Sequence, residues 1–137
     1  NDMSKSSYIR FSLRLWGEKL NPHIITNALG IKPSTSYEKG YTKNLSSGKT
    51  SAPKDLGIWV FEQVVVTSVK EELDSLLLKL GGRNMKSIEG VQIAILDFYL
   101  GLTNDNSRLD ESYECVIDNN SLNALRELGV DFRITVA

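Results

Sequence analysis

Strict alternation of apolar and polar residues marks the first predicted element of the chain. In residues 8–16 (YIRFSLRLW), apolar side chains occupy the odd positions from 9 to 15, and Arg10, Ser12 and Arg14 lie between them. A period of two residues predicts a strand with one buried face. Residues 131–136 (DFRITV) alternate in the same way and predict a second strand of this kind.

Other stretches predict strands of a different character. Residues 57–66 (GIWVFEQVVV) are rich in β-branched and aromatic side chains, which favour strands. Residues 91–101 (VQIAILDFYLG) are apolar on both faces, which is typical of a central strand. Weaker patterns predict a short edge strand or turn over residues 34–41 and a further strand over residues 113–117.

The first predicted helix is bounded by residues that are typical of helix ends. Asn21 is placed to cap a helix whose first position is Pro22, where the missing N–H costs nothing. Gly30 follows the last apolar residue of the helical pattern, and Pro33 prevents the helix from continuing. The sequence therefore predicts one short helix between Pro22 and Gly30.

Two further helices are predicted later in the chain. A leucine stripe over residues 69–80 predicts an amphipathic helix, with Ser68 and Glu71 at capping-box spacing and a pair of glycines after it. One of residues 119–121 is expected to cap a third helix, which ends at Gly129.

The order of these elements is typical of an α+β domain, in which helices pack on one face of a sheet. We predict a mostly antiparallel sheet of five to six strands with two to three helices packed on one face. A single domain is expected over residues 8–137. Residues 1–7 are expected to be a cloning remnant and a disordered N-terminus, because Asn1 and Asp2 precede Met3.

Charge divides the chain into two unlike parts. Residues 1–54 hold nine Lys and Arg but three Asp and Glu, a net charge of +6, whereas residues 55–137 carry a net charge of −7. Such a division favours a charged partner, or else produces two solvated faces.

Cys115 is the only cysteine, so no internal disulfide forms and a reducing, cytoplasmic location is expected. Because no apolar run reaches the roughly 18 residues of a membrane helix, no membrane association is expected.

Candidate catalytic residues are few. Residues 46–51 (SSGKTS) resemble the end of a phosphate-binding loop, but Lys43 stands where such a loop needs its first glycine. His23, the only histidine, and Cys115, the only thiol, are the components of a nucleophilic pair, so a small hydrolase of unknown substrate is an alternative function. The sequence has no cluster of cysteine and histidine that indicates zinc. No metal and no cofactor are therefore expected.

Acidic side chains in a polar stretch form the predicted partner-binding site: Asp105, Asp110, Glu111, Glu114 and Asp118. The EF-hand pattern is not met, because the glycine that it requires is absent. The stretch is therefore either a solvated loop or an acidic docking surface for a basic partner such as a nuclease. The basic loop over residues 42–54 and Trp59 are reserve candidates, which suit an acidic partner face.

The polar face of the first strand suggests another binding mode. Tyr8, Arg10, Arg14 and Trp16 are expected to share the outer face of the sheet with Arg133. A basic sheet face with aromatic residues is how some modules stack single-stranded RNA, so a nucleic-acid-binding module is a second alternative. The pI of about 5.9 and the absence of a glycine-aromatic RNA-binding signature argue against it.

The order of these landmarks resembles a known family. The strand YIRFSLRLWG leads to LNPHIITNALGIKP, to Lys39-Gly40, to the Gly-x-Trp strand GIWVF, to the leucine-rich LDSLLLKL and finally to SLNALRELGVDFRITVA. Over about residues 8–136, this order resembles the bacterial domain-of-unknown-function family DUF4279.

The resemblance implies a binding protein rather than an enzyme. Members of that family often look like immunity proteins of contact-dependent growth inhibition and related toxin systems. The resemblance therefore implies a small cytoplasmic inhibitor that binds a cognate toxin domain and blocks its active site or substrate surface. It implies no catalytic residues and no nucleic-acid partner, and we expect a monomer or a homodimer in the free state.

Overall fold

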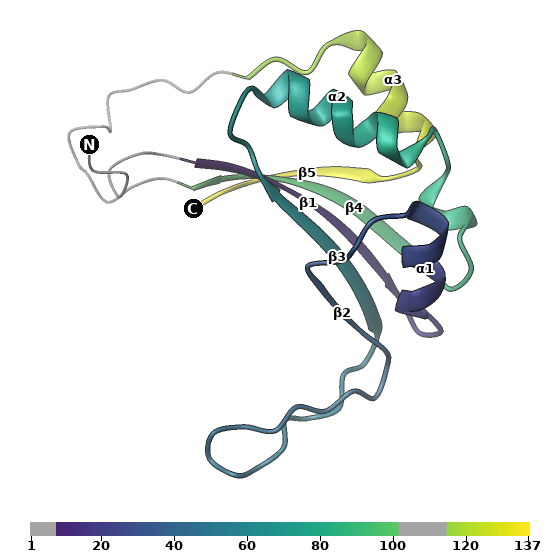
Figure 1. The fold of residues 1–137 in the computed structure, drawn as a ribbon, viewed down its shortest axis with the longest axis vertical. Helices are drawn as coiled ribbons and strands as arrows, with labels where there is room; N and C mark the ends of the chain where they lie inside the picture. Colours follow the sequence, from purple (N-terminus) through teal and green to yellow (C-terminus); the bar gives the residue numbers. More distant parts are fainter. Residues whose placement is uncertain (1–7, 102–114) are drawn as a thin grey trace, which may run out of the picture.

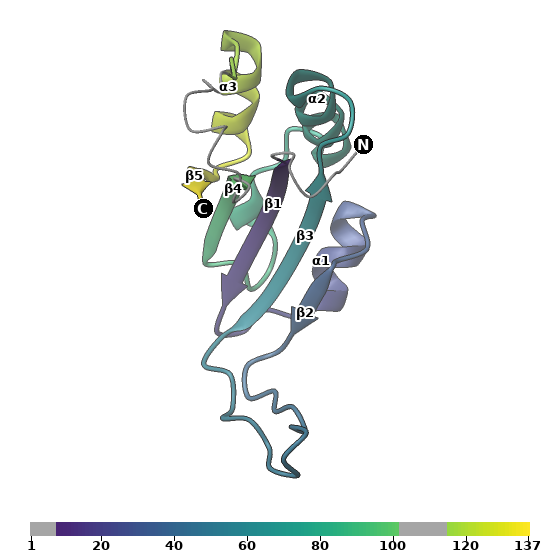
Figure 2. The same cartoon turned by 90° about the vertical axis from the view of Figure 1, so that its left-hand side faces the viewer.

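The structure, a computed structural model, describes residues 8–101 and 115–137. These residues form a five-stranded sheet with three α-helices on the same side of it (Figures 1 and 2). The predicted α+β class is therefore confirmed. In chain order the elements are β1 (Tyr8–Gly17), α1 (Pro22–Leu29), β2 (Thr35–Tyr37), β3 (Gly57–Val64), α2 (Val69–Leu80), the 3₁₀ turn η2 (Met85–Ser87), β4 (Ile93–Gly101), α3 (Asn119–Glu127) and β5 (Asp131–Val136).

β1 lies at the centre of the sheet, whose strand order is β2-β3-β1-β4-β5. It pairs antiparallel with β3 on one side and with β4 on the other. β2 is a short antiparallel edge strand beside β3, as predicted for residues 34–41. β5 pairs parallel with β4, because α3 carries the chain back between them. The segment 91–101, predicted as a central strand, thus supplies the internal strand β4.

Side chains at the odd positions of β1 form the centre of the hydrophobic core. Phe11, Leu13 and Leu15 are each at most 1% exposed, and they belong to one cluster with Leu76 of α2 and Leu125 of α3. Burying a side chain of this size contributes roughly 1.5–3 kcal/mol. Because the side chains of a strand alternate, the even positions of β1 lie on the opposite face, away from the helices.

Polar side chains cap the starts of the first two helices. Asn21 accepts a hydrogen bond from the His23 N–H at 3.0 Å, and Gly30 ends α1 with a φ of 66°. At α2, Ser68 accepts a hydrogen bond from the Glu71 N–H at 3.1 Å. Both helices therefore begin where the sequence predicted.

Glu72, rather than Glu71, ties the start of α2 to the sheet. Its carboxylate accepts hydrogen bonds from the N–H groups of Val66 at 2.6 Å and Thr67 at 2.7 Å, and from the side-chain amide of Gln63 at 2.7 Å. These hydrogen bonds, led by that of the Thr67 N–H, lower the pKa of Glu72 to about 2. A charged Glu72 therefore joins the end of β3 to the first turn of α2.

Two expectations for the later part of the chain differ from the structure. α3 is capped by Asp118, which accepts a hydrogen bond from the Ser121 N–H at 2.9 Å, and not by one of residues 119–121. Residues 115–117 form no strand, and the other two residues of that predicted strand lie outside the described residues. β4 already pairs with β1 and β5, so no edge of β4 is left for a further strand.

Glycines let the backbone pass closely at the end of β1. A Cβ on Gly17 would lie 1.8 Å from the carbonyl oxygen of Gly90, and a Cβ on Gly90 would lie 2.7 Å from that of Lys19. A Cβ on Gly57 would lie 2.9 Å from the carbonyl oxygen of Leu20. These neighbours are backbone atoms, so no side-chain rotation relieves the overlap. The turn from β1 to α1 is thereby held against β3 and the segment before β4.

Gly17→Ala is expected to destabilise the fold strongly, because the added methyl group overlaps the Gly90 carbonyl. Overpacking against backbone costs about 3 kcal/mol here. Gly48→Ala is the control: Gly48 has a φ of 84° but nothing within 4 Å of an added Cβ. Its cost is the left-handed conformation alone, roughly 1 kcal/mol. Urea unfolding measures both variants, and equal losses of stability would contradict the close backbone contact at Gly17.

Candidate functional site

One face of the sheet carries none of the helices in the described residues, and this face is the candidate functional site. In Figure 2, strands β4, β1 and β3 are seen with no helix in front of them. We call this surface the open face. It consists of Tyr8, Arg10, Ser12, Arg14 and Trp16 of β1, Thr35 and Tyr37 of β2, Ile58, Val60, Glu62 and Val64 of β3, Ile93, Ile95, Asp97 and Tyr99 of β4, and Asp131, Arg133 and Thr135 of β5. The residues that the sequence predicted on the outer face of the sheet all lie on it.

A polar row crosses the middle of the open face. Glu62, Ser12 and Asp97 lie opposite one another on β3, β1 and β4, and Arg133 continues the row on β5. The Arg133 Nε–H donates to Asp97 Oδ1 at 3.0 Å, and the Thr135 hydroxyl donates to the same oxygen at 2.9 Å. Asp97 is 5% exposed. Its buried carboxylate therefore has the hydrogen bonds that a buried charge needs.

Two arginines of β1 flank this row. Arg14 Nη2 approaches Glu62 Oε1 at 3.7 Å, a long ion pair. The Arg10 guanidinium lies over the Tyr99 ring, with 4.6 Å between Cζ and the ring centroid, and the Tyr8 ring centroid lies 5.8 Å from that of Tyr99. Stacking on an aromatic ring restricts the orientation of a guanidinium. Arg10 is thus held on the open face.

Polar atoms at the centre of the open face lack hydrogen-bond partners. The Ser12 hydroxyl and the Nε atoms of Arg10 and Arg14 are buried, and none of them has a partner. Ser12 is 1% exposed although no helix covers it. A buried polar group without a partner costs roughly 1–3 kcal/mol, and such groups are uncommon in folded proteins. Within the part of the chain that the structure describes, these unpartnered side-chain atoms are confined to the open face.

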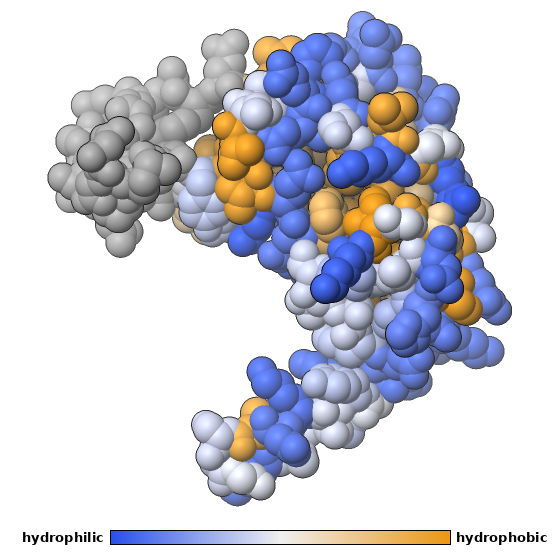
Figure 3. Space-filling view, viewed as in Figure 1, coloured by the Kyte–Doolittle hydropathy of each residue, from blue (hydrophilic) through white to orange (hydrophobic). Residues whose placement is uncertain are grey.

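A basic loop extends beside the open face. Residues 38–56 connect β2 to β3 and project well beyond the sheet, as the arm at the bottom of Figure 3 shows. An isolated bridge joins Asn44 to Thr50 in this arm. At its base, Lys54 Nζ lies 5.4 Å from the centroid of the Tyr37 ring. The arm carries four exposed lysines: Lys39, Lys43, Lys49 and Lys54.

The predicted acidic site lies mostly outside the described residues. Its members Asp105, Asp110, Glu111 and Glu114 belong to that part, so their role stays a prediction. Asp118 is described, and besides capping α3 it lies 2.9 Å from Lys70 Nζ, which also lies 2.9 Å from Asp74. The hydrogen bond from Lys70, followed by that from the Ser121 N–H, lowers the pKa of Asp118 to about 2. Asp118 thus helps to hold α3 against α2.

Other residues singled out from the sequence do not come together in the described structure. His23 lines a hollow of ≈ 380 Å³ with Tyr37, and Cys115 is not among the residues that line it. Cys115 precedes α3, and desolvation raises the pKa of its thiol, which disfavours the reactive thiolate. The interpretation of Trp59 as a partner contact is wrong, because Trp59 is fully buried and donates a hydrogen bond to Thr26 Oγ1 at 3.1 Å.

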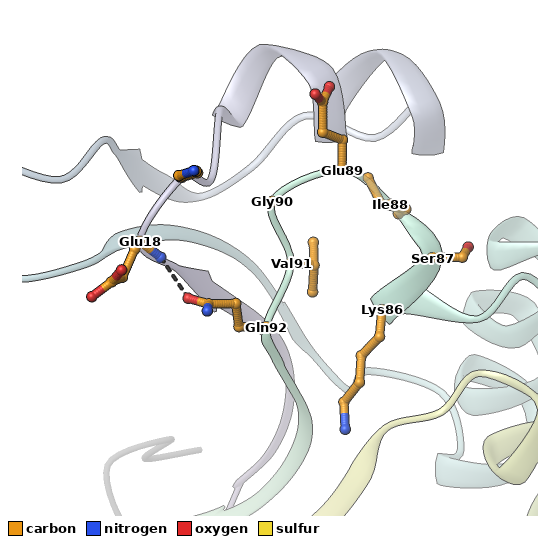
Figure 4. A pocket seen from close by; sticks show the side chains of 9 residues that line it. Glu18, Lys86, Ser87, Ile88, Glu89, Gly90, Val91 and Gln92 are labelled. Atoms are coloured by element: carbon orange, nitrogen blue, oxygen red, sulfur yellow. Dashed lines mark hydrogen bonds between the residues drawn. The ribbon is translucent and has the colours of Figure 1, made fainter.

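A hollow of ≈ 530 Å³ lies where the turn after β1 meets the segment before β4 (Figure 4). The Glu18 N–H donates to Gln92 Oε1 across it at 2.7 Å. The side chains of Glu18, Lys86 and Glu89 point in different directions rather than toward a common centre. The hollow therefore lacks the convergent polar groups that are typical of a small-molecule site.

Metal ligands and membrane helices can be described for residues 8–101 and 115–137. In these ranges no three His, Cys, Asp or Glu side chains are grouped as metal ligands. No helix within the same ranges is long and apolar enough to cross a bilayer.

Comparison with known protein families identifies the family of this chain. The family model described as Domain of unknown function (DUF4279) matches residues 7–137. The chain belongs to DUF4279. Comparisons of this DUF4279 domain with curated proteins and with solved structures find no significant match. The resemblance to DUF4279 is thus confirmed.

Sequence reasoning found only part of the open face of this DUF4279 domain. The alternation of β1 placed Arg10 and Arg14 correctly, and the same signal places Ser12 between them. Glu62 and Asp97 were not expected beside Ser12. Their positions depend on which strands pair with β1 and in which register, and no local pattern in the sequence carries that information.

Asp118 is expected to stay charged well below the usual range of a carboxyl group. Because its pKa is lowered from 3.8 to about 2, its stabilisation of α3 is fully present above pH 3.8 and is lost as the pH falls through about 2. Lys70→Met removes the main cause of this shift and should raise the pKa of Asp118 toward 3.8. A carboxyl-carbon NMR titration measures this, with Lys70→Arg as the control. An unchanged Asp118 pKa in Lys70→Met would refute the assignment.

Proposed function

We propose that this DUF4279 protein is an immunity protein, which binds a cognate bacterial toxin domain in the cytoplasm and neutralises it. It acts by non-covalent binding that blocks the active site or the substrate surface of the toxin. The family resemblance supports the toxin as the class of partner. The open face supports binding as the mode of action.

The observation that carries the proposal is the set of side chains on the uncovered sheet face. Arg10 and Tyr99 lie beside its central row and Trp16 lies at the end of β1, and these residue types are enriched at protein interfaces and among their hot spots. Apolar side chains lie near them: Val64 is 51% exposed and Ile93 is 42% exposed. A sheet face that combines stacked aromatics, arginine and exposed aliphatic groups supports association with another protein.

The acidic segment is the alternative contact surface. Asp110, Glu111 and Glu114 lie outside the described residues, and their predicted role is docking on a basic toxin such as a nuclease. The open face and the basic loop 38–56 instead favour an acidic surface of the toxin. The two candidate surfaces thus require toxins of opposite charge, so charge substitutions distinguish them.

Production of this chain together with its proposed cognate toxin domain is expected to restore growth. The double substitution Arg10→Glu and Arg14→Glu should abolish that protection, because like charges in an interface cost several kcal/mol. Such a cost weakens the Kd by about a hundredfold or more. Growth of the toxin-producing strain and calorimetric titration of the purified pair measure the two effects.

Arg126→Glu is the matched control, since Arg126 is exposed on α3, on the other side of the sheet. If the open-face variant still protects, while neutralisation of Asp110, Glu111 and Glu114 abolishes protection, the acidic segment is the contact surface. If the unsubstituted chain neither binds nor protects against the toxin domain, the proposed function itself is wrong.

A further inference from the structure

We propose that the centre of the open face recognises a carboxylate side chain from an acidic segment of the partner protein, and that Arg10, Ser12 and Arg14 hold it. That the partner is a protein rests on the proposed function. The preference for a carboxylate rests on the two arginines of β1 and on the hydrogen-bond donors at the centre of the open face.

Positive charge on the central strand is only partly balanced. β1 brings Arg10 and Arg14 to the open face and no acidic residue. Asp97 is already engaged by Arg133, and Glu62 reaches Arg14 only at 3.7 Å. Among the described residues, no carboxylate forms an ion pair with Arg10. An acidic group of a partner would therefore meet a guanidinium that these residues leave uncompensated.

Unused hydrogen-bond donors are concentrated at the same place. The Ser12 hydroxyl and the Nε–H groups of Arg10 and Arg14 find no acceptor among residues 8–101 and 115–137. They belong to alternate residues of one strand, so the three side chains share a face at a spacing of roughly 7 Å. A carboxylate offers about four acceptor positions and matches the planar fork of a guanidinium. One carboxylate can accept from the ends of both guanidinium groups, and it reaches the buried Nε–H and Ser12 hydroxyl donors when the two arginine side chains shift on binding.

The position of Arg10 and the lysines nearby also favour binding of such a ligand. The Tyr99 ring holds the Arg10 guanidinium at 4.6 Å, which reduces the conformational freedom that binding would otherwise remove. The lysines of the loop 38–56 extend the positive charge beyond the sheet, and charge of this kind speeds the encounter with an acidic partner. An acidic segment that lies along β1 toward the loop would meet positive charge along its length.

A nucleic acid fits this face less well than an acidic protein segment. The Tyr99 ring is covered by Arg10 on one side and lies beside Tyr8, so it is not a free platform for a base. Glu62 and Asp97 lie in the central row, where they repel a continuous chain of phosphates. A single carboxylate between the arginines needs no free ring, and it brings less negative charge past Glu62 and Asp97 than a chain of phosphates does.

A titration of the purified chain tests the proposal with defined probes. A short oligoglutamate peptide with blocked ends is added to isotope-labelled protein, and NMR follows the Nε–Hε signals of Arg10 and Arg14. We expect saturable shifts of these signals that weaken with added salt. An oligoglutamine peptide of equal length should cause none. An oligothymidylate of equal charge is the nucleic-acid probe, and it should bind at least about tenfold more weakly.

Substitutions separate a specific contact from general positive charge. Arg10→Gln should weaken oligoglutamate binding by about tenfold or more, and Arg10→Lys should restore only part of it, because lysine lacks the planar fork. Ser12→Ala should weaken binding without any change of charge. Arg126→Gln, on α3, removes one positive charge elsewhere and should leave the shifts unchanged. Thermal unfolding of each variant confirms that it is folded.

Three results overturn the proposal: shifts confined to the lysines of the loop 38–56, unchanged binding in both Arg10→Gln and Ser12→Ala, or tighter binding of the oligothymidylate. The last result would identify a nucleic-acid-binding face instead. These outcomes are independent of the growth assay. If variants that no longer bind oligoglutamate still protect, the proposed function stands and this inference is wrong. If the chain binds oligoglutamate but does not protect, this inference stands and the proposed function is wrong.

Discussion

The alternation of side chains along β1 is the constraint on which the rest of this protein depends. Because β1 pairs with β3 and β4 on its two sides, every side chain of β1 points either to the helices or to the open face. Phe11, Leu13 and Leu15 enter the core in this way, and Arg10 and Arg14 stay outside it. A slip of one residue would bury both arginines and expose the core. The register that stabilises the fold therefore also assembles the open face.

The two sides of the sheet differ in how completely their polar groups are paired. On the helix side, Glu72 accepts hydrogen bonds from the segment between β3 and α2, and Asp118 caps α3 while pairing with Lys70. On the open face, the Ser12 hydroxyl and two arginine Nε atoms have no partner. Local rules of this kind are broken mainly at functional sites, where stability is given up for binding. The unpaired donors thus support the proposal that a partner binds the open face.

Helix ends were predictable because the chemistry of a cap is local. Asn21 and Gly30 bound α1 as expected, since a side-chain acceptor and a left-handed residue act within a few positions of the helix end. The cap of α3 was placed too late by one residue or more, because aspartate, asparagine and serine are all good caps. The choice of Asp118 depends on its extended backbone. The role of Glu72 at the start of α2 was not predicted, because its hydrogen bonds depend on how β3 approaches α2.

By itself, the sequence determined the α+β class, the positions of the helices and the side chains of β1 that share its outer face. These features follow from hydrophobic periodicity and cap chemistry, which act over a few neighbouring residues. Only the tertiary structure decided that Glu62, Asp97 and Arg133 align with Ser12, and that β5 runs parallel to β4. Strand partners lie far apart along the chain, and their register is selected by packing and hydrogen bonding across the whole sheet, so no local pattern contains it.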